Sequence, residues 1–109
     1  MGKSYLGEFE EIVLLTVAIL HGEAYGIAII DEMETRLKRA VSIGALQTVL
    51  RRLEDKGYLK SEFGEATKVR GGKRKRYFTV TNMGKKTLKV AKEQRVGLWN
   101  AIPEIALND

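Results

Sequence analysis

The chain of 109 residues, 44% of them hydrophobic and 30% charged, has the size and balance of one small folded domain rather than of a disordered protein. It contains no cysteine, which excludes disulfides and thiolate metal sites, and a single histidine, which excludes a histidine cluster. No carboxylates lie in loops where they could converge, so we expect a protein that is not an enzyme and that needs no cofactor or metal.

The N-terminal end and the most apolar run argue against a membrane protein. Only Lys3 precedes the acidic residues Glu8, Glu10 and Glu11, which is not the pattern of a signal peptide. The run 12–20 is almost entirely apolar, but it is far shorter than the ~20 residues that span a bilayer. We therefore expect a cytoplasmic protein without a membrane partner.

Charge is distributed unevenly along a chain whose net charge is +5. Residues 1–34 hold one lysine against seven acids, whereas residues 66–92 hold ten basic residues and no acid. Such asymmetry indicates one end that faces a polyanion and another that does not. The alternative is a solvated basic face without a partner.

The first two helices are expected at residues 9–21 and 24–37. In the first, apolar residues cover nearly the whole circumference from Ile12 onward, which favours burial on two sides, against the domain core and against a second subunit. The alternative is a central helix buried entirely within one chain. Tyr25 and Gly26, at the start of the second helix, are interpreted as structural residues that allow helices to approach closely. Ala40–Val41 is a candidate third strand.

Residues 42–56 are expected to form the third helix. Ser42 is a favourable N-cap. Leu46, Leu50 and Leu53 recur at helical spacing, and Gly57 follows as a stop signal. This pattern predicts one buried leucine face and one exposed face.

The exposed face of this helix carries small residues near its start and polar or basic residues further on. Small side chains let the backbone approach DNA, the helix N-terminus can accept a phosphate, and Gln47 and Thr48 can hydrogen-bond base edges. The alternative is a core helix with a charged back, which does not explain why acids are absent before Glu54. The candidate DNA contacts of this helix are Ser42, Gly44, Ala45, Gln47, Thr48, Arg51 and Arg52.

Two β-like runs, residues 58–63 and 76–81, flank a loop rich in glycine and basic residues. Alternation of apolar residues in both runs predicts a hairpin that closes over the leucine face of the third helix. The loop lacks the glycine spacing and the Lys-Ser/Thr pair of a nucleotide-binding loop. Basic side chains at such a tip can enter a narrow minor groove. The candidate DNA contacts of the hairpin are Lys68, Arg70, Lys73, Arg74 and Lys75.

A fourth helix is expected to begin after Thr81 as N-cap and to end before Pro103. This long amphipathic helix has no core of its own left to bury against, which predicts a homodimer in which it packs on the partner. The candidate interface residues are Phe9, Val13, Val17, Leu88, Ala91, Arg95, Leu98, Trp99 and Ile102.

Several short motifs follow one another in a distinctive order over roughly residues 9–100. They are Tyr25-Gly26, then SIGAL at 42–46, LRRLEDKGYL at 50–59, GGKRKRYFTVT at 71–81, and finally Gly84-Lys85 and Leu88. This set resembles the PadR-like transcriptional regulators. The resemblance implies a dimeric DNA-binding protein. In some short members an aromatic residue on the fourth helix lines a cavity for a small hydrophobic effector at the dimer interface, which would be Trp99; the alternative is that Trp99 only anchors the interface. The family commonly has tyrosine at the position of Gln47, so that tyrosine's DNA contacts do not transfer.

These observations predict a mainly α fold with a small β-hairpin, a winged helix-turn-helix followed by a C-terminal dimerisation helix. Residues 1–81 would form the DNA-binding domain and residues 82–109 the dimerisation helix of the same compact unit. We expect a sequence-specific regulator, a repressor, that binds a palindrome in double-stranded DNA as a homodimer and is released by a small effector. The alternative is a winged-helix module that binds a protein or effector and has only weak, non-specific DNA affinity.

Overall fold

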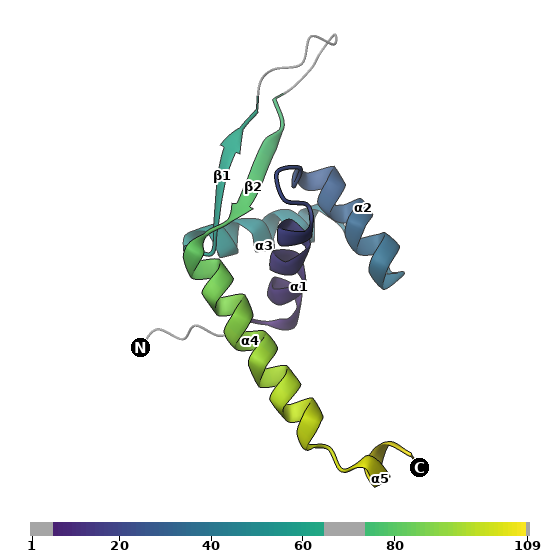
Figure 1. Cartoon of the computed structure of the whole chain (residues 1–109). Helices are drawn as coiled ribbons and strands as arrows, with labels where there is room; N and C mark the ends of the chain where they lie inside the picture. Colours follow the sequence, from purple (N-terminus) through teal and green to yellow (C-terminus); the bar gives the residue numbers. More distant parts are fainter. Residues whose placement is uncertain (1–5, 65–73, 109) are drawn as a thin grey trace.

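A computed structural model describes residues 6–64 and 74–108 of the chain. The elements follow the expected order, with ends shifted by one or a few residues (Figure 1). They are α1 (Glu8–Ile19), α2 (Gly26–Leu37), α3 (Ile43–Asp55), β1 (Leu59–Phe63), β2 (Arg76–Val80), α4 (Asn82–Ala101) and α5 (Glu104–Leu107). The short α5 was not expected, because Pro103 was interpreted only as the end of the fourth helix.

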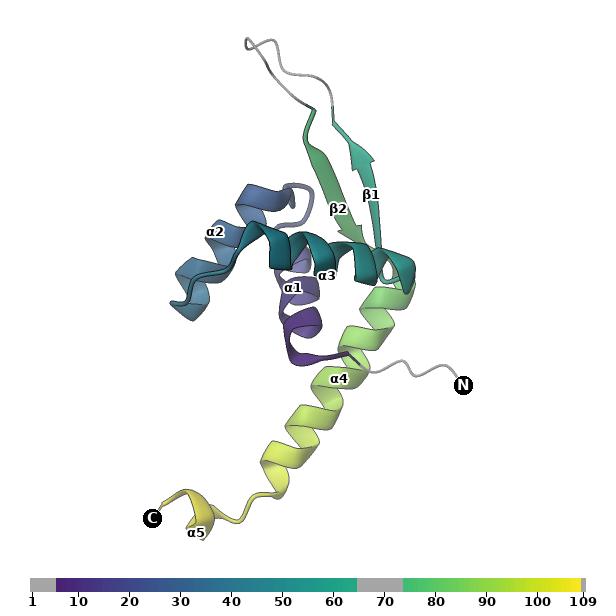
Figure 2. The same ribbon diagram turned by 180° about the vertical axis from the view of Figure 1, so that it is seen from behind.

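The arrangement is that of a winged helix with an appended C-terminal helix, which confirms the predicted fold class. Seen from behind, α3 crosses in front of α1, the hairpin rises from the C-terminal end of α3, and α4 runs away from the body (Figure 2). The strands are antiparallel, with Leu59 opposite Val80 and Phe63 opposite Arg76. We call this hairpin the wing.

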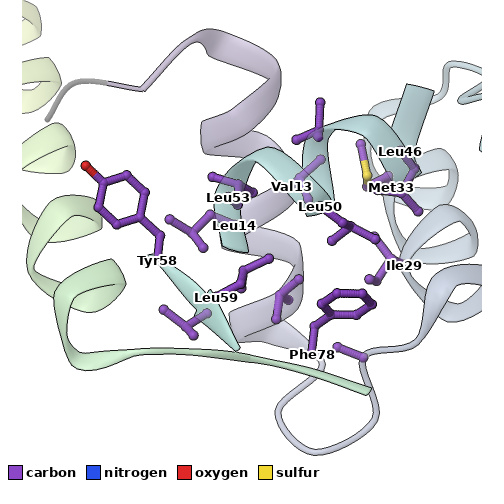
Figure 3. Close-up of a cluster of buried hydrophobic side chains, with 14 residues drawn as sticks. Val13, Leu14, Ile29, Met33, Leu46, Leu50, Leu53, Tyr58, Leu59 and Phe78 are labelled. Atoms are coloured by element: carbon purple, nitrogen blue, oxygen red, sulfur yellow. The ribbon is translucent and has the colours of Figure 1, made fainter. Parts of the chain in front are cut away.

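The core lies where α1, α2, α3 and the base of the wing meet (Figure 3). The fully buried side chains of Leu14, Ile29, Leu46 and Leu53 come from all three helices. Phe78 closes the core from the wing, where it is likewise buried. Each such side chain contributes about 1.5–3 kcal/mol relative to an exposed one, so the predicted leucine face orients α3.

The candidate strand at Ala40–Val41 was wrong. The backbone N–H of Val41 donates to the Glu34 carboxylate at 2.9 Å, and the segment is not a strand. The edge of β2 is met instead by the turn before α2, where the N–H of Phe78 donates to the carbonyl of Ala24 at 2.8 Å. The Glu34 carboxylate of α2 therefore accepts the hydrogen bond that the Val41 N–H would have donated in a third strand.

The start of α4 is fastened to the base of the wing. Thr81 is its N-cap, as predicted, because its hydroxyl oxygen accepts from the N–H of Gly84 at 3.0 Å. The same hydroxyl donates to the carbonyl of Gly57 at 2.6 Å, and the N–H of Thr81 donates to the carbonyl of Tyr58 at 3.0 Å. The direction in which α4 leaves the domain is thus set at its first turn.

Candidate nucleic-acid interface

The outer face of α3 is exposed along its whole length. Ser42 caps the helix as predicted, with its hydroxyl oxygen accepting from the N–H of Ala45 at 3.1 Å. The burial pattern separates the leucine face from the polar face as the spacing predicted. All the candidate DNA contacts of this helix are exposed: Ser42, Gly44, Ala45, Gln47, Thr48, Arg51 and Arg52.

An open groove of about 820 Å³ lies between α3, the start of α2 and the wing. It brings together Gln47 and Arg51 of α3 with Arg74 and Lys75 of the wing, all four of which were candidate contacts. Thr48 and Arg52 are not part of its lining. The lining consists of Tyr25, Gly26, Ile27, Ile43, Gln47, Leu50, Arg51, Glu54, Arg74, Lys75, Arg76 and Phe78.

The groove is strongly cationic. Arg51, Arg74, Lys75 and Arg76 face a single carboxylate, that of Glu54. A concave surface lined by one sign of charge concentrates oppositely charged ligands and accelerates their association. Such a groove beside an exposed helix suits the sugar–phosphate backbone of a duplex whose bases are contacted by that helix.

Glu54 ties the wing to α3. Its carboxylate accepts from Arg76 Nη2 at 3.0 Å and from the hydroxyl of Ser61 at 2.6 Å, and Arg76 Nε donates to the Ser61 hydroxyl at 2.9 Å. Sequence reasoning missed this trio as a unit. Glu54 and Ser61 are seven residues apart, on different elements, and only the turn between α3 and β1 brings them together.

Two further cations of the wing, Arg74 and Lys75, are also held by neighbouring groups. Arg74 Nε donates to the carbonyl of Gly64 at 3.0 Å, and the ammonium of Lys75 lies 4.1 Å from the centre of the Tyr25 ring. The other three candidates of the hairpin lie outside the described residues: Lys68, Arg70 and Lys73.

The buried carboxylate of Glu10 links α1 to the end of α3. Burial would raise the pKa of Glu10, but a hydrogen bond from Lys56 at 2.8 Å, another from the N–H of Gly7 at 2.8 Å, and the charges of Lys56 and Arg52 outweigh it. The pKa of Glu10 therefore lies below its usual value, and the ion pair stays formed at neutral pH. It supports the helix that carries the candidate contacts.

Comparison with known proteins gives this surface a family. The sequence pattern of the transcriptional regulator PadR-like family matches residues 14–90, which is more than half of the chain. The chain belongs to the PadR-like family. It is thus a DNA-binding transcriptional regulator with a winged-helix fold. None of the curated proteins matches the sequence significantly.

Solved structures agree with this assignment. A PadR-like transcription factor from Bacteroides fragilis is 27% identical, with 84% of each chain covered and a TM-score of 0.71. A PadR family regulator from Clostridium difficile is 28% identical over 82% of this chain and 91% of its own, with a TM-score of 0.64. A transcriptional regulator from Clostridium thermocellum is 29% identical over 78% and 79%, with a TM-score of 0.66.

The expected interface residues of α1 differ in their exposure in the single protomer. Val13 and Val17 are buried in the protomer's own core and present no surface to a partner. Phe9 is half-buried and packs against that core. The exposed large apolar side chains of α1 are instead Leu15 and Ile19, which are 44% and 49% exposed.

On α4 the candidate interface residues divide between the two ends of the helix. Leu88 and Ala91 are half-buried near its start. Arg95 forms a bidentate ion pair with Glu11 on α1 of the same protomer. The hydrogen bonds and the charge of Glu11 raise the pKa of Arg95. Beyond it, Leu98 is 73% and Trp99 63% exposed, with Ile102 exposed as well.

Neither a membrane span nor a metal site emerges in the described part of the chain. Within residues 6–64 and 74–108, no helix is long and apolar enough to cross a membrane. The same residues hold no cluster of three or more histidine, aspartate or glutamate side chains that could bind a metal ion.

Proposed function

We propose that this regulator is a homodimeric repressor that binds a palindromic operator. The observation that carries the proposal is the exposed polar face of α3 beside a cationic groove. In a symmetric dimer the two α3 helices would enter successive major grooves about 34 Å apart. Occupying a promoter in this way excludes other proteins from the same DNA.

Sequence readout is assigned to Gln47 and Thr48. The side chain of Gln47 can pair with the two hydrogen-bonding groups of adenine in the major groove, and Thr48 can contact a base edge or a thymine methyl group. Gly44 and Ala45 have small side chains, so the backbone of the first turn of α3 can approach the DNA closely. Arg51 faces the groove and is assigned to a phosphate or a guanine.

Backbone contacts are assigned to the wing and to the remaining arginine of α3. Arg74 and Lys75 line the groove, and Lys68, Arg70 and Lys73 precede them in the chain. Phosphate contacts position a protein on the duplex without reading its sequence. Arg52 lies outside the groove lining and is assigned to a phosphate on the other side of α3.

The dimer interface is assigned to the apolar residues that α1 and α4 leave exposed. Leu15 and Ile19 of α1 take the place of Val13 and Val17, and Leu98, Trp99 and Ile102 of α4 are retained. So many large apolar side chains exposed on two helices are typical of a surface covered by a partner. Trp99, 63% exposed, is assigned to this interface, and the resemblance to short family members supports a small hydrophobic effector beside it that would release the DNA.

Fluorescence anisotropy tests this proposal. The protein is titrated against labelled duplex from its own upstream region and against a shuffled duplex of equal length, at several salt concentrations. If the dimer neutralises ~8 phosphates, log affinity should fall with log salt at a slope near −7. We expect a preference of ~100-fold or more for the upstream region, within the range of specific regulators. Equal and weak binding to both would favour a module that binds a protein or effector instead.

Substitutions then separate readout from backbone contact. Gln47→Ala and Thr48→Ala should change which sequence is preferred, at ~1–3 kcal/mol per lost base contact. Thr35→Ala, at an exposed threonine of α2, is the matched control and should change nothing. Arg74→Ala should weaken binding to every duplex alike. An unaltered sequence preference in both α3 variants would show that α3 is not the reading helix.

A further inference from the structure

Tyr25 touches the wing although it belongs to the start of α2. Its ring meets that of Tyr77 edge to face, with centroids 5.6 Å apart and planes at 70°, and the ammonium of Lys75 lies 4.1 Å from its centre. Both partners are on β2 or directly before it, two residues apart. Side chains at that spacing share one face of a strand, so a single ring reaches both.

The backbone brings this ring to the edge of the wing. The N–H of Phe78 donates to the carbonyl of Ala24, which places the residue before Tyr25 against β2. The carbonyl of Tyr25 in turn accepts from the N–H of Ile29 inside α2. These two hydrogen bonds fix the backbone of Tyr25 at the start of α2, next to β2.

The start of α2 also adjoins the first turn of α3. A Cβ atom on Gly26 would meet the side chain of Ile43 at 3.6 Å, and both residues line the same groove. That distance is an ordinary van der Waals contact, so the space at Gly26 would also admit an alanine. Tyr25, by contrast, packs on the wing and lines the groove, so it does not serve helix packing alone.

We propose that Tyr25 is a positioning residue that latches the wing to α2 and holds Lys75 at the lip of the groove. On the α3 side the wing is held by Arg76, Glu54 and Ser61, and Tyr25 supplies the support from the opposite side. The distance between the wing cations and the outer face of α3 is then set by the fold. The consequence for DNA rests on the proposed function, whereas the latch itself does not.

The latch is tested first without DNA. Because the chain has no cysteine, two can be introduced at the exposed positions Asp31 of α2 and Lys60 of β1, which do not touch Tyr25 or Tyr77, and spin-labelled. Labelled protein is mixed with an excess of unlabelled chain, so that only distances within one protomer are measured. Tyr25→Phe, which keeps the ring, should match the parent distance distribution. Tyr25→Leu, which keeps apolar bulk without the ring, should broaden or shift it.

The second measurement uses the upstream and shuffled duplexes. Tyr25→Leu and Lys75→Met should each make the salt slope of log affinity less steep by about 2. Each variant loses one phosphate contact in each of the two protomers of the dimer, and each contact contributes ~0.9 to the slope. The Tyr25→Leu/Lys75→Met double variant should lose no more than either single variant, since both remove the same contact. Tyr25→Phe should retain the parent slope, and the preference between duplexes should be unchanged in all of them.

The two readings separate the latch from the proposed function. An unchanged distance distribution in Tyr25→Leu, or additive losses of slope in the double variant, would overturn the latch. A parent protein without preference for either duplex would overturn sequence-specific regulation and leave the distance measurement to decide the latch. A loss of thermal stability in Tyr25→Leu with parental distances and slope would mean that Tyr25 only stabilises the fold, and would also overturn the proposal.

Discussion

Gly84→Ala should uncouple α4 from the base of the wing. Gly84 lies in the first turn of α4, and a Cβ atom placed there would be 2.3 Å from the carbonyl oxygen of Tyr58 and 2.8 Å from a methyl group of Val80. The nearer atom belongs to the backbone and accepts the hydrogen bond from Thr81. It cannot move aside as the end of a flexible side chain would.

The expected loss of stability follows from this geometry. Relieving the overlap requires a shift of about 1 Å, and overpacking of this kind costs about 1–3 kcal/mol. The shift also weakens the Thr81 cap and its bond to Tyr58, at about 1 kcal/mol each, while alanine returns up to ~1 kcal/mol through its helix propensity. The free energy of unfolding should therefore fall by about 2–4 kcal/mol, a large part of the ~5–15 kcal/mol typical of a domain.

Urea unfolding followed by circular dichroism measures this change, at one protein concentration because the proposed dimer would contribute to stability. Gly97→Ala is the matched control, since it lies in the same helix and a Cβ atom there meets nothing within 4 Å. It should be neutral or stabilising by up to ~1 kcal/mol. If Gly84→Ala proved as stable as Gly97→Ala, the packing of α4 against Tyr58 would not exist in solution.

Three further substitutions probe the reading helix, the core ion pair and the interface. Gly44→Ala adds a Cβ atom in open space and should raise the free energy of unfolding by up to ~1 kcal/mol. It should nevertheless weaken operator binding, because the added methyl group keeps the backbone away from the DNA. Tighter binding would show that the backbone does not approach DNA at this position. Glu10→Gln should lower the free energy of unfolding at pH 7. Because the pKa of Glu10 in the folded protein lies below its usual 4.5, the difference between variant and parent should vanish as the pH falls through that folded pKa. A difference that persisted at lower pH would exclude the charge of Glu10 as its cause. Leu98→Glu, at a side chain 73% exposed in the protomer, should leave the monomer folded but dissociate the dimer in sedimentation; undiminished dimerisation would remove this residue from the interface.

Local chemistry made the helices and the exposed face of α3 predictable. Ser42 and Thr81 are capping residues whose side chains bond the amides three residues on, which needs no knowledge of the rest of the fold. The spacing of Leu46, Leu50 and Leu53 determined which side of α3 is buried. The same helical spacing placed the candidate DNA contacts on the opposite, exposed side of α3.

Features that depend on distant partners were not predictable in this way. Helix α1 is apolar nearly all round, so its sequence does not show which side faces the core of the protomer. Val13 and Val17, expected at a dimer interface, are buried in that core, whereas Leu15 and Ile19 are exposed. Residues 40–41 resembled a strand because nothing local shows that Glu34 captures the Val41 amide. In both places tertiary contacts, not the local pattern, decide the structure.

The groove shows why a DNA-facing surface would retain an acid among its cations. Glu54 lowers the attraction of the groove for any polyanion, and so its presence needs a compensating effect. Its bond to Arg76 holds that guanidinium, just as Gly64 holds Arg74 and Tyr25 holds Lys75. A cation already held in place loses less side-chain entropy when it meets a phosphate, at about 0.5–1.5 kcal/mol per immobilised side chain. The groove therefore gives up some positive charge and gains fixed orientation of its cations, which favours a duplex docked in one register over one that slides.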